Sequence, residues 1–159
     1  MTKVNIFTDG ACSCNGSKDA IGGYGVIMLA VDPKTKKVAE KVLRGSDINT
    51  TNNKMELYAV IDGIKALKRS CEVVVISDSQ YVVNGGASLQ DTVNRGYKNK
   101  SGSVVANKEM WEVLYETIKT GGHTVTFQKV SGHSGEVYNE RCDTIAKEQI
   151  KKRKELANG

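Results

Sequence analysis

One short apolar run limits the folds open to this chain more than any other feature. Residues 72–77 read EVVVIS, with no alternation of polar and apolar residues after the glutamate. A strand with one face in solvent shows that alternation, whereas a continuous apolar run is typical of a strand covered on both faces, as in the centre of a parallel sheet. The run therefore predicts a sheet with helices packed against it.

The residues before this run indicate three strands. Polar and apolar residues alternate over 3–9, and further strand patterns cover 23–31 and 37–45, with a turn signal at Asp32-Pro33 between the last two. Because their connections are short, we expect the three strands to form an antiparallel meander.

Helical patterns come after the three strands. Apolar residues recur at helical spacing from Leu57 to Leu67, behind three residues suited to cap a helix, Thr51, Asn52 and Asn53. The rest of the chain predicts a short helix from Ser79, a basic loop, a helix over 107–120, a strand over 123–130 and a helix from Asn139. This order predicts a mixed α/β (α+β) fold in which helices flank a mixed sheet, in a single domain over residues 1–159.

The composition is that of a soluble globular protein, with 39% hydrophobic and 26% charged residues. The first residues, MTKVNIFTDG, lack the apolar core of a signal peptide, and no apolar run is long enough to span a membrane. We expect a cytoplasmic protein with no membrane partner, acting as a monomer.

The four cysteines do not form a recognisable framework. Cys12, Cys14, Cys71 and Cys142 are not spaced like a set of disulfides. Cys12 and Cys14 would make half of a zinc site, but no second Cys/His pair stands at a matching distance. We therefore expect free thiols.

The formal net charge of +5 is unevenly distributed. Between Asp91 and Glu109 there is no acidic residue, and the segment contains four basic ones, Arg95, Lys98, Lys100 and Lys108. Such a segment is either a contact for a polyanionic partner or a solvated loop, and charge alone slightly favours the loop. The basic run at 151–154 is better explained as the solvated end of a helix.

Four carboxylates are distinguished by their positions. Asp9 ends the first predicted strand and Asp78 directly follows the apolar run, at strand ends where sites collect in α/β sheets. A single aspartate there is equally typical of a turn or a helix cap. Glu56 and Asp143 lie, at about 100° per residue, on the rims of the apolar stripes of their helices, so that each is expected to face the sheet.

These four carboxylates need a counter-charge, because an unpaired desolvated charge costs several kcal/mol. No Lys or Arg is evident as their partner in the sequence. Mg²⁺ prefers carboxylate and water oxygens, and two such ions about 3.5–4 Å apart would clamp a phosphodiester for attack by water. The chemistry that fits is phosphoryl transfer.

Four segments carry a resemblance to a known family. FTDGACSCNG, TTNNKMELYAVI, SDSQYVVNGG and SGHSGEVYNERCD resemble, in order and spacing, the signature regions of type 1 ribonuclease H, and the match runs from about Lys3 to Gln149. The resemblance implies a ribonuclease H-like fold with a five-stranded mixed sheet, three antiparallel N-terminal strands and flanking helices. It also implies an endonuclease that cuts the RNA strand of RNA–DNA hybrids with two Mg²⁺ ions, for which Mn²⁺ is a substitute, and leaves 3′-hydroxyl and 5′-phosphate ends.

The resemblance assigns catalytic roles to residues of this chain. The family's metal-binding carboxylates fall on Asp9, Glu56, Asp78 and Asp143, and its loop histidine falls on His133. Gly132 and Gly135 give that loop freedom, so that His133 is placed to move protons or to assist product departure. The other histidine, His123, follows two glycines before a strand and is assigned to a turn.

Substrate contacts are carried over in the same way. Four amides, which can both donate to and accept from a 2′-hydroxyl, resemble the family's minor-groove contacts: Asn15, Asn52, Asn53 and Gln80. Thr51 and Asn107 resemble a pocket for a phosphate of the DNA strand. Trp111 matches an aromatic residue near the DNA path, although core packing explains a tryptophan on an apolar helix face equally well.

The sequence also departs from the family pattern. The loop after Asp9 is longer than the form common in bacterial members, Asn49 stands where an arginine is usual, and Leu89 and Val93 occupy positions often held by tryptophan. These changes bear on hybrid affinity rather than on chemistry. Two alternatives remain at this point, a hybrid-binding module without activity and a different metal nuclease on the same architecture.

Overall fold

The computed structural model describes residues 1–15, 18–130 and 136–158. Ten elements follow one another along the chain: β1 Thr2–Ser13, β2 Ile21–Val31, β3 Val38–Ile48, α1 Asn52–Lys65, β4 Cys71–Ser77, α2 Gln80–Ala87, α3 Leu89–Asn94, α4 Lys108–Gly121, β5 Thr124–Lys129 and α5 Glu136–Asn158. Among the described residues, every helix is too short or too polar to cross a lipid bilayer.

The five strands form one mixed sheet in the order β3-β2-β1-β4-β5. β1, β2 and β3 pair antiparallel, whereas β4 pairs parallel with both β1 and β5. The predicted mixed sheet with an N-terminal antiparallel meander is therefore confirmed. The apolar run lies in β4, beside the central strand β1.

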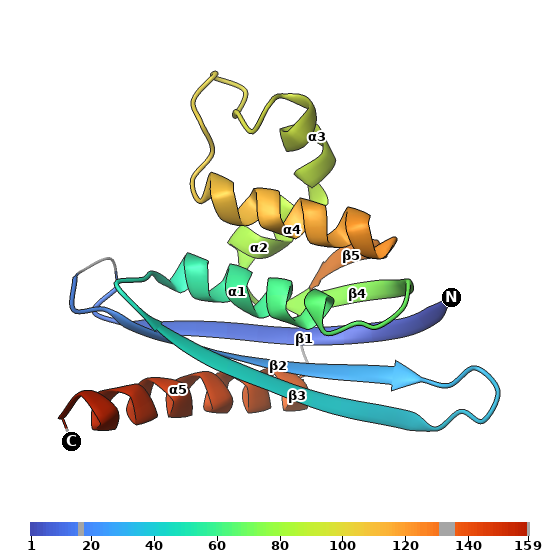
Figure 1. Ribbon diagram of the computed structural model, residues 1–159, viewed down its shortest axis with the longest axis horizontal. Coiled ribbons are helices and arrows are strands. Elements are labelled where there is room, and N and C mark those ends of the chain that lie inside the picture. The colour runs from blue at the N-terminus through green and yellow to red at the C-terminus, as the bar shows by residue number, and fades with distance from the viewer. Residues whose placement is uncertain (16–17, 131–135, 159) are drawn as a thin grey trace.

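Helices cover both faces of the sheet (Figure 1). α1 packs on one face, with α4 against it, and α5 packs on the other face. Successive residues of β1 point to opposite faces, so that Ile6 joins the larger core beneath α1 and Phe7 joins a smaller core beneath α5. Phe7, Ile27 and Cys142 form the buried centre of the smaller core.

Two glycines allow helices to approach the sheet closely near Asp9. A Cβ on Gly10 would lie 2.6 Å from the backbone nitrogen of Glu56, and a Cβ on Gly25 would lie 2.7 Å from the carbonyl oxygen of Cys142. Because Gly25 is the β2 partner of Asp9, both helices are held against one point of β1. This arrangement brings α1 and α5 to Asp9.

Several predicted boundaries were wrong, among them the end of β3, which lies at Ile48 rather than at residue 45. β1 continues past Asp9 to Ser13, because its last residues still pair with β2 although β4 has ended. The predicted basic loop begins with an extra short helix, α3, and α5 begins at Glu136 rather than at Asn139. The cap prediction is confirmed, since the Thr51 side chain accepts a hydrogen bond from the Lys54 N–H at the start of α1.

Candidate metal centre

Three of the predicted carboxylates lie together. Asp9 comes from β1, Glu56 from α1 and Asp78 from the residue after β4, and each offers an oxygen within 4.8 Å of the others. Asp9 and Asp78 are neighbours because Phe7 pairs with Ile76, and each aspartate comes two residues later in its chain segment. Asp9 and Glu56 are each only 6% exposed, whereas Asp78 is exposed.

One backbone amide orients the two buried carboxylates. The Gly10 N–H donates to Asp9 Oδ1 and to Glu56 Oε1, both at 3.0 Å. The second oxygen of Glu56 is buried and has no hydrogen-bond partner among the described residues. A buried carboxylate oxygen without a donor is unfavourable by itself and is a natural ligand for a cation.

Burial raises the pKa values of both carboxyl groups. Burial, followed by the nearby charge of Asp78, raises the pKa of Asp9 to about 7. Burial, followed by the charge of Asp9, raises the pKa of Glu56 to about 9. Among the described residues no Lys or Arg pairs with either group. An oxygen donor set of this kind, short of positive charge, fits Mg²⁺ or a similar hard cation.

Asp143 agrees with the prediction in one respect and departs from it in another. Its carboxyl group lies within hydrogen-bonding reach of Asp9, as expected of a residue that faces the sheet, but its side chain is 41% exposed and its Oδ2 lies 2.9 Å from Lys147 Nζ, one turn along α5. The expectation that no Lys or Arg serves the four carboxylates was therefore wrong for Asp143. Asp143 and Lys147 are four residues apart on one helix, and this spacing is the feature of the sequence that indicates their ion pair. Asp143 still lies near Asp9, because its negative charge also contributes to the raised pKa of Asp9.

Predicted substrate residues surround the start of α1. The Asn15 side-chain oxygen accepts from the Asn52 N–H at 2.8 Å, which ties the loop after β1 to the first turn of the helix. The side chains of Asn52 and Asn53 are exposed in this turn, and Glu56 follows Asn52 by one turn. An exposed amide surface therefore adjoins the carboxylates.

Gln80 has two partners on the other side of the carboxylates. Its side-chain nitrogen donates to Asn84 Oδ1 at 2.6 Å, and its side-chain oxygen accepts from Lys129 Nζ at 2.9 Å. Lys129 ends β5, opposite Ser77 of β4. Lys129 could not be identified from the sequence, because nothing local connects residue 80 to residue 129.

Asn107 and Trp111 meet at one hydroxyl group. Asn107 Nδ2 and the Trp111 indole N–H each donate to the Tyr81 hydroxyl at 3.0 Å, and that hydroxyl donates to the Ala106 carbonyl at 3.2 Å. Trp111 is only 5% exposed and belongs to the larger core. The predicted contact of Trp111 with DNA does not fit this burial, and core packing is the better description. A cavity of about 350 Å³ adjoins this group, lined also by Asn84 and Arg95.

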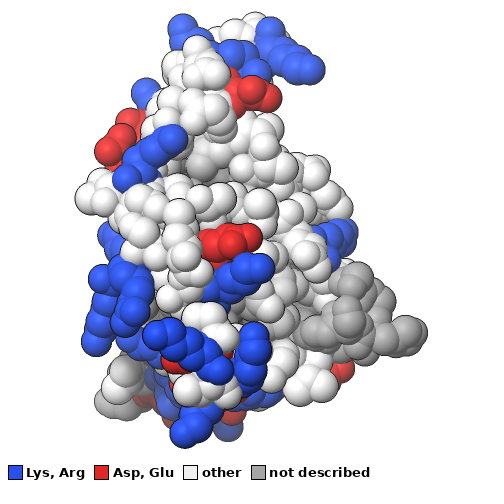
Figure 2. Space-filling view, turned by 90° about the vertical axis from the view of Figure 1, so that its right-hand side faces the viewer, with Lys and Arg blue, Asp and Glu red and all other residues white. Residues whose placement is uncertain are grey.

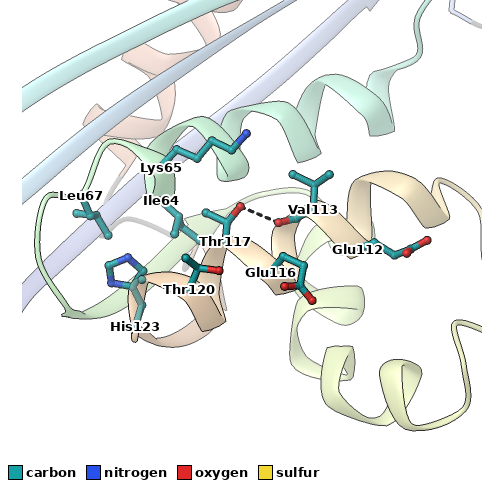
Figure 3. A pocket seen from close by; sticks show the side chains of 10 residues that line it. Ile64, Lys65, Leu67, Glu112, Val113, Glu116, Thr117, Thr120 and His123 are labelled. Atoms are coloured by element: carbon teal, nitrogen blue, oxygen red, sulfur yellow. Dashed lines mark hydrogen bonds between the residues drawn. The ribbon is translucent and has the colours of Figure 1, made fainter.

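His133, the predicted loop histidine, lies outside the described residues. The described histidine, His123, does not join the carboxylates. His123 accepts a hydrogen bond from the Cys71 N–H at 3.1 Å, as expected of a structural residue beside a turn. It lines a cavity of about 500 Å³ between the ends of α1 and α4, whose walls include Ile64 and Leu67 (Figure 3). None of the four carboxylates borders that cavity.

All four cysteines are free thiols, as predicted.

Known proteins resemble this chain over nearly its whole length. The chain matches the family model described as RNase H over residues 1–151. It is 43% identical over 152 residues to a ribonuclease H of Clostridium botulinum, covering 94% of this chain and 97% of the relative. It is also 43% identical over 155 residues to a ribonuclease H of Caldicellulosiruptor saccharolyticus, covering 95% of this chain and 98% of that one.

Solved structures show the same fold. LC9-RNase H1, described as a type 1 RNase H with the type 2 active-site motif, aligns with a TM-score of 0.79 and 29% identity over 94% of this chain and 72% of that chain. LC11-RNase H1 in complex with an RNA/DNA hybrid aligns with a TM-score of 0.64 and 23% identity, over 94% and 98% of the two chains.

Proposed function

The chain belongs to the ribonuclease H family, and from that premise we propose that it is an endonuclease that hydrolyses the RNA strand of RNA–DNA hybrids, leaving 3′-hydroxyl and 5′-phosphate ends. The observation that carries the proposal is the cluster of Asp9, Glu56 and Asp78 beside exposed amides. The carboxylates suit a metal-assisted attack on a phosphodiester, and the amides suit a strand that presents 2′-hydroxyl groups.

Four carboxylates are proposed to hold two Mg²⁺ ions, with Mn²⁺ as a substitute: Asp9, Glu56, Asp78 and Asp143. When bound, the cations supply an activated water and offset the charge that develops at the phosphate. The Gly10 N–H keeps Asp9 and Glu56 in fixed orientations, so that these two carboxylates need little rearrangement to bind. Asp143, which now pairs with Lys147, would be the fourth carboxylate to hold a cation.

Recognition of the hybrid is proposed to use both sides of the carboxylates. Asn15, Asn52, Asn53 and Gln80 would contact 2′-hydroxyl groups and the minor groove. The Gln80 amide is held by Lys129 and Asn84, which would limit its rotation before substrate binds. Thr51 and Asn107 would hold a phosphate of the DNA strand.

His133 is proposed to transfer a proton or to assist departure of the product. We further propose that the chain acts as a monomeric, single catalytic domain over residues 1–159, in the cytoplasm, with Mg²⁺ as its metal. The relatives support the catalytic part of this proposal. Sedimentation analysis tests whether the protein is a monomer.

Cleavage of four matched duplexes tests the function. We expect cleavage in Mg²⁺ of the RNA strand of an RNA–DNA hybrid, with no cleavage of its DNA strand, of duplex RNA or of duplex DNA. The products should carry 5′-phosphate and 3′-hydroxyl ends. Equal cleavage of duplex DNA, or products with a cyclic phosphate, would contradict the proposal.

A further inference from the structure

We propose that the end of the molecule remote from the carboxylates is a second binding surface, which holds double-stranded nucleic acid through its phosphates. This inference rests on the proposed function, because it takes nucleic acid as the polyanion that the protein meets. The surface, called here the hairpin-end patch, consists of seven exposed cations: Lys3, Lys34, Lys36, Lys37, Lys41, Lys68 and Arg69.

The fold gathers these cations from four segments of the chain. They come from the start of β1, the β2–β3 hairpin, the start of β3 and the loop between α1 and β4. Lys3 stands opposite both Val31, the last residue of β2, and Glu72, near the start of β4, so that all four segments meet at one end of the sheet. Seen from this end, Lys and Arg cover more of the lower half of the surface than Asp and Glu do (Figure 2).

The three acids of these segments offset part of the charge of the patch, but none forms an ion pair with its cations among the described residues. Asp32 Oδ1 accepts from the Lys34 N–H at 2.8 Å and the Thr35 N–H at 3.0 Å, and these bonds lower the pKa of Asp32. Glu40 forms a bidentate ion pair with Arg141, with both N–O distances 2.9 Å. Asp32 thus binds backbone N–H groups of the hairpin, and Glu40 binds an arginine outside the patch. Glu72 is the remaining acid of these segments.

The patch carries most of the net charge of the chain. Its seven cations face three acids, a surplus of four, whereas the whole chain has a net charge of +5. Within the described ranges, none of the seven cations has a carboxylate partner. Cations without internal partners can release counterions when they bind phosphates, which is the main source of sequence-independent affinity for a duplex.

The hairpin also presents its lysines on an ordered turn. The Lys36 N–H donates to the Asp32 carbonyl, and the Asp32 N–H donates to the Lys37 carbonyl, both at 2.9 Å. Lys36 has a φ of 62°, so that the chain reverses tightly at this point. Three lysines therefore project from one short and well-defined tip.

The patch is separate from the carboxylates. Lys3 precedes Asp9 by six residues of β1, which corresponds to roughly 20 Å at 3.3 Å per residue. The patch contains no amide side chain placed to read 2′-hydroxyl groups, and phosphate contacts carry no sequence information. It should therefore bind duplex DNA and hybrid alike, as a second stretch of duplex beyond the one at the carboxylates.

An anionic membrane is the other extended polyanion that such a patch could meet. Three exposed apolar side chains adjoin the patch, Met1, Val31 and Val38. Membrane-surface binding normally adds Trp, Phe or Leu to the cations, and two valines and a methionine provide little area for insertion. The observations therefore favour nucleic acid, and the membrane becomes an outcome of the test.

The test measures binding of a short, labelled DNA duplex by fluorescence anisotropy at several salt concentrations. The hairpin variant carries Lys34→Gln, Lys36→Asn and Lys37→Gln, with asparagine chosen because it tolerates the left-handed backbone of Lys36. The control variant carries Lys151→Gln, Lys152→Gln and Lys154→Gln, which removes the same charge from exposed positions of α5. Thermal melting checks that both variants are folded.

We expect the hairpin variant to bind the DNA duplex at least about tenfold more weakly at low salt. Its slope of log affinity against log salt should fall by about 2 to 3, since each phosphate contact contributes roughly 0.9. The control variant should resemble the wild type, and both variants should cleave a short hybrid at the wild-type rate.

Two results would overturn the inference while leaving the proposed function in place. One is hybrid cleavage at the normal rate with equal duplex affinity in wild type, hairpin variant and control. The other is capture of the wild type by vesicles of anionic lipid, lost in the hairpin variant, without any change in its duplex binding. Failure of the wild type to cleave hybrid would instead overturn the proposed function.

Discussion

At the residue scale, the site depends on two carboxylates that the fold buries without supplying a cation. Asp9 and Glu56 share the N–H of Gly10, and the other Glu56 oxygen has no donor in the described part of the chain. Burial raises both pKa values, so that each carboxyl group holds its proton to a higher pH than usual until a metal replaces that proton. The features that disfavour these two carboxylates as unpaired anions are those that favour a bound cation.

Replacement of Asp9 by asparagine should separate chemistry from binding. The amide keeps the shape of the side chain but loses the anionic ligand, and we expect cleavage to fall by at least about 10²–10³-fold, the scale on which loss of one charge-stabilising group acts. Hybrid binding should stay near wild type, because the amide residues are untouched. Single-turnover cleavage and anisotropy measure the two quantities, and near-normal turnover in Mg²⁺ would rule out Asp9 as a metal ligand.

Lys147 should compete with the metal for Asp143. Exposed ion pairs of this kind are worth about 0.2–1 kcal/mol, so that Lys147→Met should tighten Mg²⁺ or Mn²⁺ binding by about two- to fivefold. Calorimetric titration of the metal-free protein measures this change directly. Lys151→Met, one turn further along α5, is the matched control and should have a smaller effect. Equal isotherms for wild type and Lys147→Met would show that the ion pair does not oppose metal binding.

Individual site residues were predictable when a local pattern placed them. The end of the apolar run indicated Asp78, and helical periodicity indicated that Glu56 faces the sheet. Asp9 was selected as a strand end, although β1 continues past it to Ser13. The hydroxyl of Tyr81 was not predictable, because its partners Asn107 and Trp111 follow it by 26 and 30 residues and meet it only in the folded chain.

At the element scale, the approach of α1 and α5 to β1 and β2 determines where the carboxylates lie. Gly10 leaves space for the backbone of α1, and Gly25 leaves space for the backbone of α5. A side chain at either position would meet main-chain atoms, which cannot move without moving the whole helix. The glycines therefore contribute to the site through the helices they admit.

Gly10→Ala should disturb the site more than Gly22→Ala. The new Cβ at position 10 would lie 2.6 Å from Glu56 N, whereas at position 22 it would meet the side chains of Met55 and Thr50 at 2.5–2.6 Å, and the methionine can change rotamer. We expect Gly10→Ala to lose about 1–3 kcal/mol of folding free energy, as overpacking does, together with much of its metal affinity.

Urea unfolding and metal titration of these two variants check the difference. Gly22→Ala is a close control, because position 22 lies in the neighbouring strand and faces the same helix, α1. Equal losses of stability and metal affinity in the two variants would show that the position of α1 does not depend on the glycine at residue 10.

Element types were predictable from periodicity, but their ends were less so. The sequence of β1 after Asp9, GACS, has a glycine and no apolar alternation, and it remains a strand because β2 pairs with it through Ser13. That pairing partner is itself rich in glycine, with Gly22, Gly23 and Gly25, and so carries a weak strand signal of its own. Tertiary pairing, rather than local preference, extended both strands.

At the scale of the whole molecule, the clustered acidic and basic side chains lie at different places along β1. The carboxylates lie near its middle, and the hairpin-end patch lies around its start. The sequence shows the count of charges but not this separation, because the seven cations come from segments that only the sheet topology brings together. The segment 91–109, in contrast, was visible as basic in the sequence itself.

The stability of the metal-free protein should fall as pH rises. Asp9 and Glu56 have folded-state pKa values of about 7 and about 9, against ordinary values of 3.8 and 4.5. At a pH between the ordinary and the folded-state pKa of each group, the folded state therefore binds more protons than the unfolded state. The stability contributed by these protons is complete below about pH 4 and is lost as pH rises through 7 and 9. Thermal melting in a chelator should show this fall, and it should be flatter in Glu56→Gln than in Glu148→Gln, an exposed control.

Magnesium should reverse that fall, because a cation binds the deprotonated carboxylates of the folded state and stabilises it by mass action. The rise in melting temperature on adding Mg²⁺ should therefore grow with pH as Asp9 and Glu56 ionise, and it should be much smaller in Glu56→Gln. Melting curves with and without Mg²⁺ across the same pH range measure it. A rise that is the same at every pH, or the same in Glu56→Gln as in the wild type, would show that the ion binds elsewhere and that the buried carboxylates are not its ligands.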